Sequence, residues 1–190
     1  MFVATDNRPN NGSHTMFRHG QELQLKNFSR NESRRLAVRW VLWNIALHLI
    51  VRPWFTPRRA RTLVLKMFGA KVGKRCAIRE NTYIHMPWNL EMGDDVWIGR
   101  GVSIFNHATV SIGNDVCLSQ SATICASGHA LEPGFAYRHR PISIGSNVWL
   151  GIACLVLPGS EIQDRSVVKG GAVIRPEVAK VQPTDTPPLR

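Results

Sequence analysis

The sequence lacks several features that define common protein classes, although it is 190 residues long and 44% hydrophobic. It has no apolar run long enough to span a bilayer, because the stretch Val41–Val51 is short and is interrupted by Asn44 and His48. The first apolar run also lies too far along the chain, and lacks a cleavage-type end, for a secretory signal peptide. No glycine loop of the P-loop type is present, which argues against a kinase or an NTPase.

Cysteine is scarce, and none of the four cysteines forms a CxxC pair. Cys76 and Cys154 fall where the repeat described below requires a small residue, so we interpret them as packing residues. Disulfide and metal roles are the alternatives, and Cys117 and Cys125 carry no motif of either kind. Unpaired thiols fit a reducing cytosol, and we predict a cytoplasmic protein without a bound metal.

Acidic residues are scarce in the first part of the chain. Residues 1–75 contain 15 Lys and Arg against 3 Asp and Glu, whereas residues 76–190 contain 9 against 10. This asymmetry predicts that the N-terminal part faces an anionic partner. No aromatic and basic module that reads nucleic acid is present, so a membrane surface or an anionic glycan precursor is favoured over nucleic acid.

What the sequence does contain is a repeat of six residues. Aliphatic residues recur at every sixth position, at Ile144, Leu150, Val156, Ile162, Val168 and Ile174. A small or short-branched residue follows four places after each of the first five. A helix repeats at 3.6 residues and a half-buried strand at 2, so neither explains this period. A period of six is typical of a parallel β-helix, in which each hexad is one short strand and a turn.

The repeat begins at Val72 and is interrupted in a regular way. After each of the first two sets of three hexads the next aliphatic residue comes eight places on, at Met92 and Ile112. Three hexads therefore form one three-sided coil, with two residues added at a corner. Trp88 breaks the small-residue rule, and we expect a side loop to leave the coil there. The pattern lapses over residues 126–142, where Pro133 and Gly134 indicate a long projecting loop.

These patterns divide the chain into four parts. Residues 1–30 are polar and lack periodicity, which predicts a disordered arm. Residues 31–70 form a basic, tryptophan-rich helical segment, and residues 71–177 form the β-helix domain with its loop at 126–142. Residues 178–190 are a proline-rich tail.

The helical segment has two interpretations. Apolar residues recur at spacings of three and four from Leu36 to Trp54, and a second short helix is expected over Arg58–Phe68. The first helix either packs across the repeat domain or a neighbouring subunit, or lies on a membrane with its tryptophans at headgroup depth. In the second case the contact is made through residues 34–66, at the inner face of the membrane.

Motifs beyond the hexads resemble a known family. The stepped hexads, a long loop that opens with a histidine, and Asn147-Val-Trp-Leu-Gly151 after it resemble the hexapeptide-repeat acyltransferases over Val72–Glu177. Pro87-Trp-Asn-Leu90 and Val96-Trp-Ile-Gly99 are similar, more narrowly, to acetyltransferases of colanic acid and related exopolysaccharide synthesis. The resemblance implies an all-β solenoid, a single-stranded left-handed parallel β-helix with an N-terminal helical segment. It also implies a homotrimer that binds acetyl-CoA in the groove between neighbouring coils.

The activity implied by this resemblance is O-acetylation of a sugar hydroxyl with acetyl-CoA as the donor. His129 matches the family's catalytic position, and an imidazole with a pKa near 6.5 suits a general base, although a structural turn histidine is the alternative. Asn106 and His107 match a substrate-contacting position, while a corner-capping asparagine is the open alternative for Asn106. Trp97 resembles a residue that lines the acceptor side, or it packs against the next subunit.

The resemblance also assigns residues to the cofactor. Trp149 and Gly151 match the part of the groove that takes the pantetheine arm, where a glycine would let the thioester approach backbone N–H groups. Arg175 falls where many relatives have a Thr-Lys pair near the CoA phosphates. The positive charge is retained there, whereas the threonine is lost.

Two other classes of protein remain as alternatives. A γ-carbonic-anhydrase-like zinc enzyme uses the same solenoid, but two of its histidines must lie close in sequence. Here His129 and His139 are ten residues apart, and His85 and His107 are twenty-two apart. A non-catalytic scaffold recruited to membranes by the basic helix is the second alternative, against which the well-placed loop histidine counts.

Overall fold

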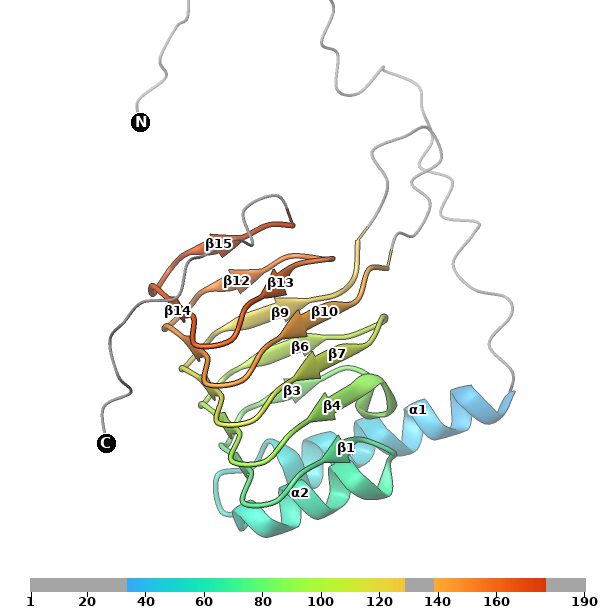
Figure 1. Ribbon diagram of the computed structural model, residues 1–190. Helices are drawn as coiled ribbons and strands as arrows, with labels where there is room; N and C mark the ends of the chain where they lie inside the picture. Colours follow the sequence, from blue (N-terminus) through green and yellow to red (C-terminus); the bar gives the residue numbers. More distant parts are fainter. Residues whose placement is uncertain (1–33, 129–138, 177–190) are drawn as a thin grey trace, which may run out of the picture.

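The computed structural model describes residues 34–128 and 139–176, in which short strands wind into a three-sided parallel solenoid (Figure 1). The strands form three parallel sheets of five, and the chain visits the three sheets in rotation. We call these sheets faces A, B and C. Face A contains β1 (Lys71–Val72), β4 (Leu90–Met92), β7 (Val110–Ile112), β10 (Ile142–Ile144) and β13 (Glu161–Ile162). Face B contains β2 (Ala77–Ile78), β5 (Trp97–Ile98), β8 (Cys117–Leu118), β11 (Trp149–Leu150) and β14 (Val167–Val168). Face C contains β3 (Tyr83–Ile84), β6 (Ser103–Phe105), β9 (Thr123–Cys125), β12 (Leu155–Val156) and β15 (Val173–Ile174).

The predicted interior of the solenoid is confirmed. The six aliphatic residues from Ile144 to Ile174 that define the repeat are at most 4% exposed. Each interior residue stands on its equivalent one coil away, as Ile98 pairs with Leu118 and Leu118 with Leu150. The core is therefore a set of aliphatic columns that run along the solenoid axis.

The small corner positions are also as expected. Cys154, Ser160 and Ser166 are buried, and burial raises the pKa of the Cys154 thiol to about 11. All four cysteines are free. Cys154 is thus a neutral packing residue rather than a reactive thiolate.

Two of the three corners of each coil turn on a residue with positive φ. The corner between faces A and B uses Arg75, Asp95, Asp115, Asn147 and Arg165, and the corner between B and C uses Asn81, Gly101, Ser121, Ala153 and Gly171. This conformation is unfavourable for most residues with a side chain. The surrounding coils must therefore hold these corners in place.

A ladder of side chains supports the A–B corner. The backbone N–H of Lys74 donates to Asp94 Oδ1 at 2.7 Å, and that of Asp94 donates to Asn114 Oδ1 at 2.8 Å. The N–H of Asn114 donates to Ser146 Oγ at 3.1 Å, and that of Ser146 donates to Asp164 Oδ1 at 2.7 Å. Each coil is thereby bonded to the next at the same corner.

The third corner, between faces C and A, receives all the additional residues. In the first coil it contains the short 3₁₀ helix η3 (Pro87–Asn89), and β4 begins directly afterwards. The side loop expected at Trp88 is therefore wrong, because the chain makes a compact turn in which Arg39 lies 4.4 Å from the Trp88 ring centroid. The predicted long loop leaves and rejoins the solenoid at this same corner, between β9 and β10; residues 129–138 lie outside the described part.

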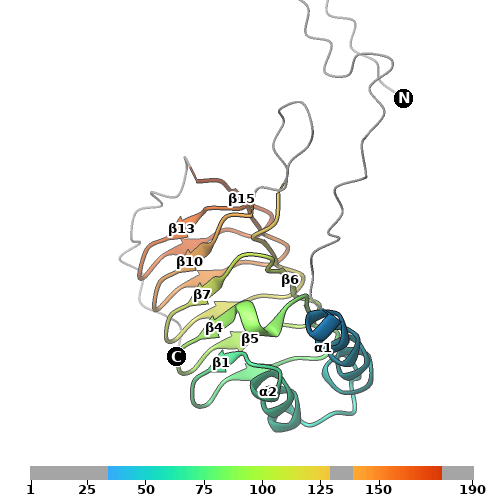
Figure 2. The same ribbon diagram turned by 90° about the vertical axis from the view of Figure 1, so that its right-hand side faces the viewer.

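The expected helices lie at the end of the solenoid that begins with β1, as both views show (Figures 1 and 2). They are α1 (Arg34–Ala46), which continues as the π-helix η2 (Leu47–Val51), and α2 (Arg58–Met67). Trp43 is fully buried and donates its indole N–H to the Ile84 carbonyl at 2.8 Å. Arg61 is 2% exposed and donates to the carbonyls of Ile78 and Pro53, and burial lowers its pKa. One side of the helical segment thus packs on the repeat domain.

The interior columns give a direct test of this architecture. Leu118→Ala should lower the free energy of unfolding by about 2–5 kcal/mol, because Leu118 is fully buried between two other aliphatic residues of its column. The same change at Leu42, which is 52% exposed on α1, should cost less than about 0.5 kcal/mol. Urea denaturation at one protein concentration measures both. Equal losses would contradict the column arrangement.

Candidate functional site

The C–A corner brings three histidines together. The ring centroids of His85 and His107 are 4.4 Å apart, and those of His107 and His139 are 4.8 Å apart with nearly parallel planes. The Tyr83 hydroxyl lies 2.8 Å from His85 Nδ1. The edge of the Trp40 ring meets His85 at a centroid distance of 6.4 Å. An aromatic column thus runs from α1 to the point where the long loop rejoins the solenoid.

His107 occupies the centre of this column. Burial, followed by the neighbouring His85 and His139, lowers the pKa of His107 to about 4. Its Nδ1 is hydrogen-bonded to the hydroxyl of Ser127, which lies at the start of the long loop. His107 is therefore neutral at physiological pH, and it contacts residues on both sides of the loop.

Asn106, predicted to contact the acceptor, is fully buried. Its Nδ2 donates to the Met86 carbonyl at 2.6 Å, and its Oδ1 accepts from the Met86 N–H at 2.9 Å. Both the oxygen and the nitrogen of the side-chain amide thus form hydrogen bonds with the backbone one coil away. This geometry favours the corner-capping alternative for Asn106, and a contact with substrate stays a prediction.

The two tryptophans predicted to line the site lie on face B. Trp97 pairs with Cys117, and Cys117 pairs with Trp149, so the two indoles are two coils apart on one outer surface. They are 41% and 47% exposed. The Trp97 ring lies under the guanidinium groups of Arg58 and Arg79, and the Trp149 Nε1–H donates to Ser119 Oγ at 2.8 Å. Face B is thus an aromatic surface with basic residues beside it.

Gly151, at the end of β11, is required by the packing of the coils. A Cβ atom there would lie 2.5 Å from the Gly170 N and 2.7 Å from the Val168 O. The Gly151 N–H already donates to the Val168 carbonyl at 2.8 Å. The expectation that a glycine here exposes backbone N–H groups to a thioester is therefore wrong for this N–H, although Gly151 can still border the groove.

One chain does not bring all the predicted residues together. Face B, with Trp149, lies opposite the C–A corner of the prism, where His107 lies. Arg175 is exposed and follows β15 on face C, in the last coil. His129, the predicted base, lies outside the described residues. Ser127 and His139, which precede and follow His129 in the sequence, both contact His107 at the C–A corner.

Sequence reasoning missed the roles of His85 and His139. The spacing of twenty-two between His85 and His107 is one coil of twenty residues plus two, which was a usable signal. His139 lies inside the gap in the repeat, where no register can be assigned. Within residues 34–128 and 139–176 no group of three His, Cys, Asp or Glu residues is placed to hold a metal ion.

Comparison with known proteins gives the same picture as the motifs. The chain is 36% identical over 111 residues to WcaF of Escherichia coli, a protein named for a role as an acetyltransferase in colanic acid biosynthesis. The alignment covers 58% of this chain and 61% of that relative. The resemblance to hexapeptide-repeat acetyltransferases is confirmed. No protein-family model matches the chain.

Solved structures of hexapeptide-repeat acetyltransferases share the fold. A galactoside acetyltransferase in complex with coenzyme A superposes with a TM-score of 0.66 at 23% identity, over 74% of this chain and 72% of that one. The hexapeptide-repeat acetyltransferase VCA0836 of Vibrio cholerae gives 0.67 at 20% identity, over 75% and 82%. The predicted left-handed parallel β-helix with an N-terminal helical segment is confirmed.

The depressed pKa of His107 predicts how acid affects stability. The folded-state pKa of about 4 is below the ordinary value of 6.5, so the unfolded chain binds more protons between these values. The contribution of His107 to the free energy of unfolding is therefore complete above pH 6.5 and is lost as the pH falls toward 4. His107→Phe, which keeps a ring in the column, should reduce the drop in the thermal unfolding midpoint over this range. An equal drop in both proteins would contradict the assignment.

Proposed function

We propose that this protein is an acetyl-CoA-dependent O-acetyltransferase that acts on a sugar hydroxyl of an exopolysaccharide intermediate. The similarity to the colanic acid enzyme supports the substrate class, and the galactoside acetyltransferase with coenzyme A supports the donor. The alignment spans about three-fifths of the curated relative, so the activity of the whole protein is part of the proposal. A homotrimer located in the cytoplasm, at the inner face of the membrane, is the form in which we propose that it acts.

In this mechanism His129 removes the proton from the acceptor hydroxyl as its oxygen attacks the thioester carbonyl. The tetrahedral intermediate collapses to the sugar ester, and the CoA thiolate leaves and takes the proton from the imidazolium. His107 is a poor base for this step, because a group with a pKa near 4 binds protons weakly at neutral pH. His107 instead contacts Ser127 and His139, which lie near the two ends of the loop that carries His129.

The observation that carries the proposal is the division of the predicted site between opposite sides of the prism. The C–A corner supplies the histidines, whereas face B supplies Trp149 and Gly151 for the pantetheine arm and Trp97 for the acceptor. These parts can meet only if the corner of one copy faces face B of another. A cyclic trimer makes three such contacts, each shared by two copies. Arg175 would meet the CoA phosphates at the same junction.

Catalysis by His129 is tested first. His129→Ala should lower CoA release from acetyl-CoA and a sugar acceptor by about 10²–10⁴-fold, while the mass of the oligomer stays unchanged. A wild-type protein that releases no CoA with any nucleotide- or lipid-linked sugar would instead favour a non-catalytic scaffold.

Sharing of the site between copies is tested by mixing two inactive proteins. His129→Ala loses the base and Trp149→Glu loses the cofactor surface, so each should be inactive as a homo-oligomer. Random mixed trimers, formed by coexpression, should recover about a quarter of wild-type turnover. Each site needs an intact C–A corner from one copy and an intact face B from its neighbour, and each of these is present in half of the cases. A mixture as inactive as its two components would place the whole site within one copy.

A further inference from the structure

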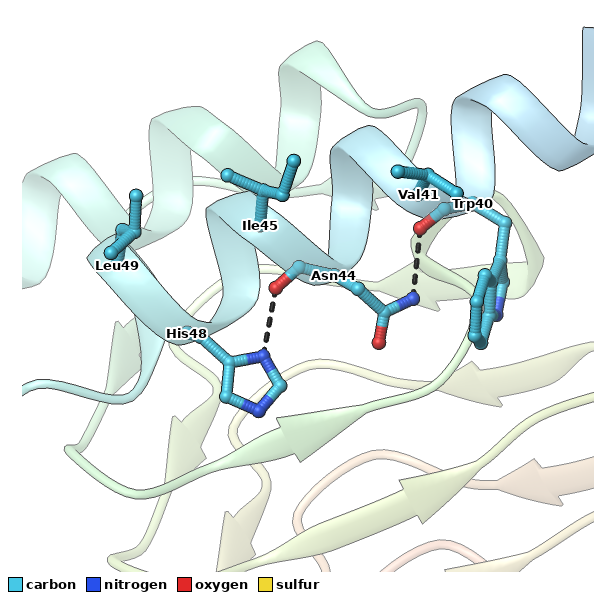
Figure 3. Close-up of a pocket in the computed structure, with 6 residues that line it drawn as sticks. All are labelled: Trp40, Val41, Asn44, Ile45, His48 and Leu49. Atoms are coloured by element: carbon cyan, nitrogen blue, oxygen red, sulfur yellow. Dashed lines mark hydrogen bonds between the residues drawn. The ribbon is translucent and has the colours of Figure 1, made fainter.

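The side of the helical segment that faces away from the solenoid is apolar along its length. Five side chains at helical spacing on α1 and η2 are 51–66% exposed, namely Val38, Val41, Leu42, Ile45 and Leu49. Three of these, with Trp40, Asn44 and His48, line a shallow groove of about 470 Å³ (Figure 3). The opposite side of the same helix already packs on the solenoid through Trp43 and Leu47. The outer stripe therefore has no partner within the described chain.

Two aromatic residues extend this surface. Trp54 and Phe55 form the turn between η2 and α2 and are 81% and 68% exposed, with their ring centroids 6.1 Å apart. On α2, Leu63 and Met67 are 60% and 75% exposed. Exposed tryptophan beside aliphatic residues is typical of segments that lie at the boundary between headgroups and acyl chains.

The charges around the apolar stripe have one sign. Residues 34–70 contain eight Lys and Arg and no Asp or Glu. Arg61 is buried in the fold, and Arg52 and Arg58 are exposed but contact Asn81 and the Trp97 ring respectively. Arg59 and Lys66 are also exposed, on α2. A symmetric contact with a second copy would bring two surfaces that carry only positive charges against each other, which is unfavourable. An anionic amphiphilic surface matches both the charge and the apolar side chains.

We propose that the outer sides of α1, η2 and α2, together with the Trp54–Phe55 turn, bind the headgroup region of an anionic phospholipid bilayer. We call this area the cap surface. Among the described residues no helix is long and apolar enough to cross a bilayer. In this proposal the cap surface lies on the membrane, with Trp54 and Phe55 inserted between the headgroups and the basic residues at the phosphates.

This orientation has a consequence for the acceptor, and that part rests on the proposed function. Trp40 on α1 contacts His85, so the histidine column rises from the cap along one edge of the solenoid. Neighbouring coils are about 4.8 Å apart, which puts the loop corner about 10 Å above the level of His85. The loop corner would then lie above the bilayer by this distance plus the thickness of the helical layer, about 10 Å. A glycan on a lipid diphosphate in the same membrane can extend to that height.

Vesicle flotation with the full-length protein tests the cap surface without any substrate. The wild type should float with vesicles of phosphatidylcholine and phosphatidylglycerol, and not with phosphatidylcholine alone. Trp54→Ala with Phe55→Ala, and separately Arg59→Glu with Lys66→Glu, should each lower the bound fraction at least about tenfold. Arg165→Glu with Lys169→Glu makes the same charge change at the far end of the solenoid and should leave binding unchanged.

Three outcomes would overturn the proposal. The first is a wild type that fails to float with anionic vesicles. The second is a loss of binding in Arg165→Glu with Lys169→Glu that is as large as the loss in Arg59→Glu with Lys66→Glu. The aromatic pair could instead reduce the oligomeric mass and leave flotation unchanged, which would assign the surface to a second copy. Because acetyl transfer is measured separately, loss of docking and loss of catalysis are distinguishable.

Discussion

The parallel backbone hydrogen bonds between successive coils are the constraint on which this structure depends. On face B, the N–H groups of Ala77, Trp97 and Cys117 each donate at 2.8–2.9 Å to a carbonyl of the next coil. This pairing repeats every twenty residues in the first three coils and every eighteen in the last two, so each side chain packs on its equivalent in the next coil. Aliphatic residues then form the interior columns, and outward residues form exposed columns. Sequence spacing is thereby converted directly into position on the prism.

The three corners do not contribute equally to this order. The A–B and B–C corners turn on positive-φ residues, and side chains such as Asp94 and Asn114 bond neighbouring coils at the A–B corner. The C–A corner has no regular series of positive-φ residues or of side-chain bonds between the described coils. The number of residues in it also differs from coil to coil. Residues can be added there without disturbing the paired strands. The 3₁₀ turn at Pro87–Asn89, the Asn106–Met86 contact and the long loop therefore all fall at this one corner.

The six-residue period predicted the features that repeat from coil to coil. It did not predict the contacts at the C–A corner, where the number of residues differs between coils. The interior columns, the small corner residues and both helices followed from spacing, and handedness came only from the resemblance. A large residue such as Trp88 does not fit a hexad corner and therefore favours a side loop, yet Trp88 packs beside Arg39 in a compact turn. The contact of His139 with His107 joins a residue in the gap to one in the repeat, so no period predicted it. The need for glycine at position 151 arises from the backbone of the next coil, a contact that residue spacing does not predict.

The prism also separates the proposed tasks of the molecule in space. Face A presents a polar outer column, which includes Lys71, Glu91 and Ser111, whereas face B presents the two tryptophans. Most of the large exposed apolar residues lie at the helical end together with exposed basic residues, and three histidines lie at one edge. Paired strands form no hinge between these regions, so the number of coils sets their separation, at about 4.8 Å for each coil. The solenoid therefore holds the histidine corner at a fixed distance from the helical end. That property suits the proposed transfer to an acceptor that projects from a membrane surface.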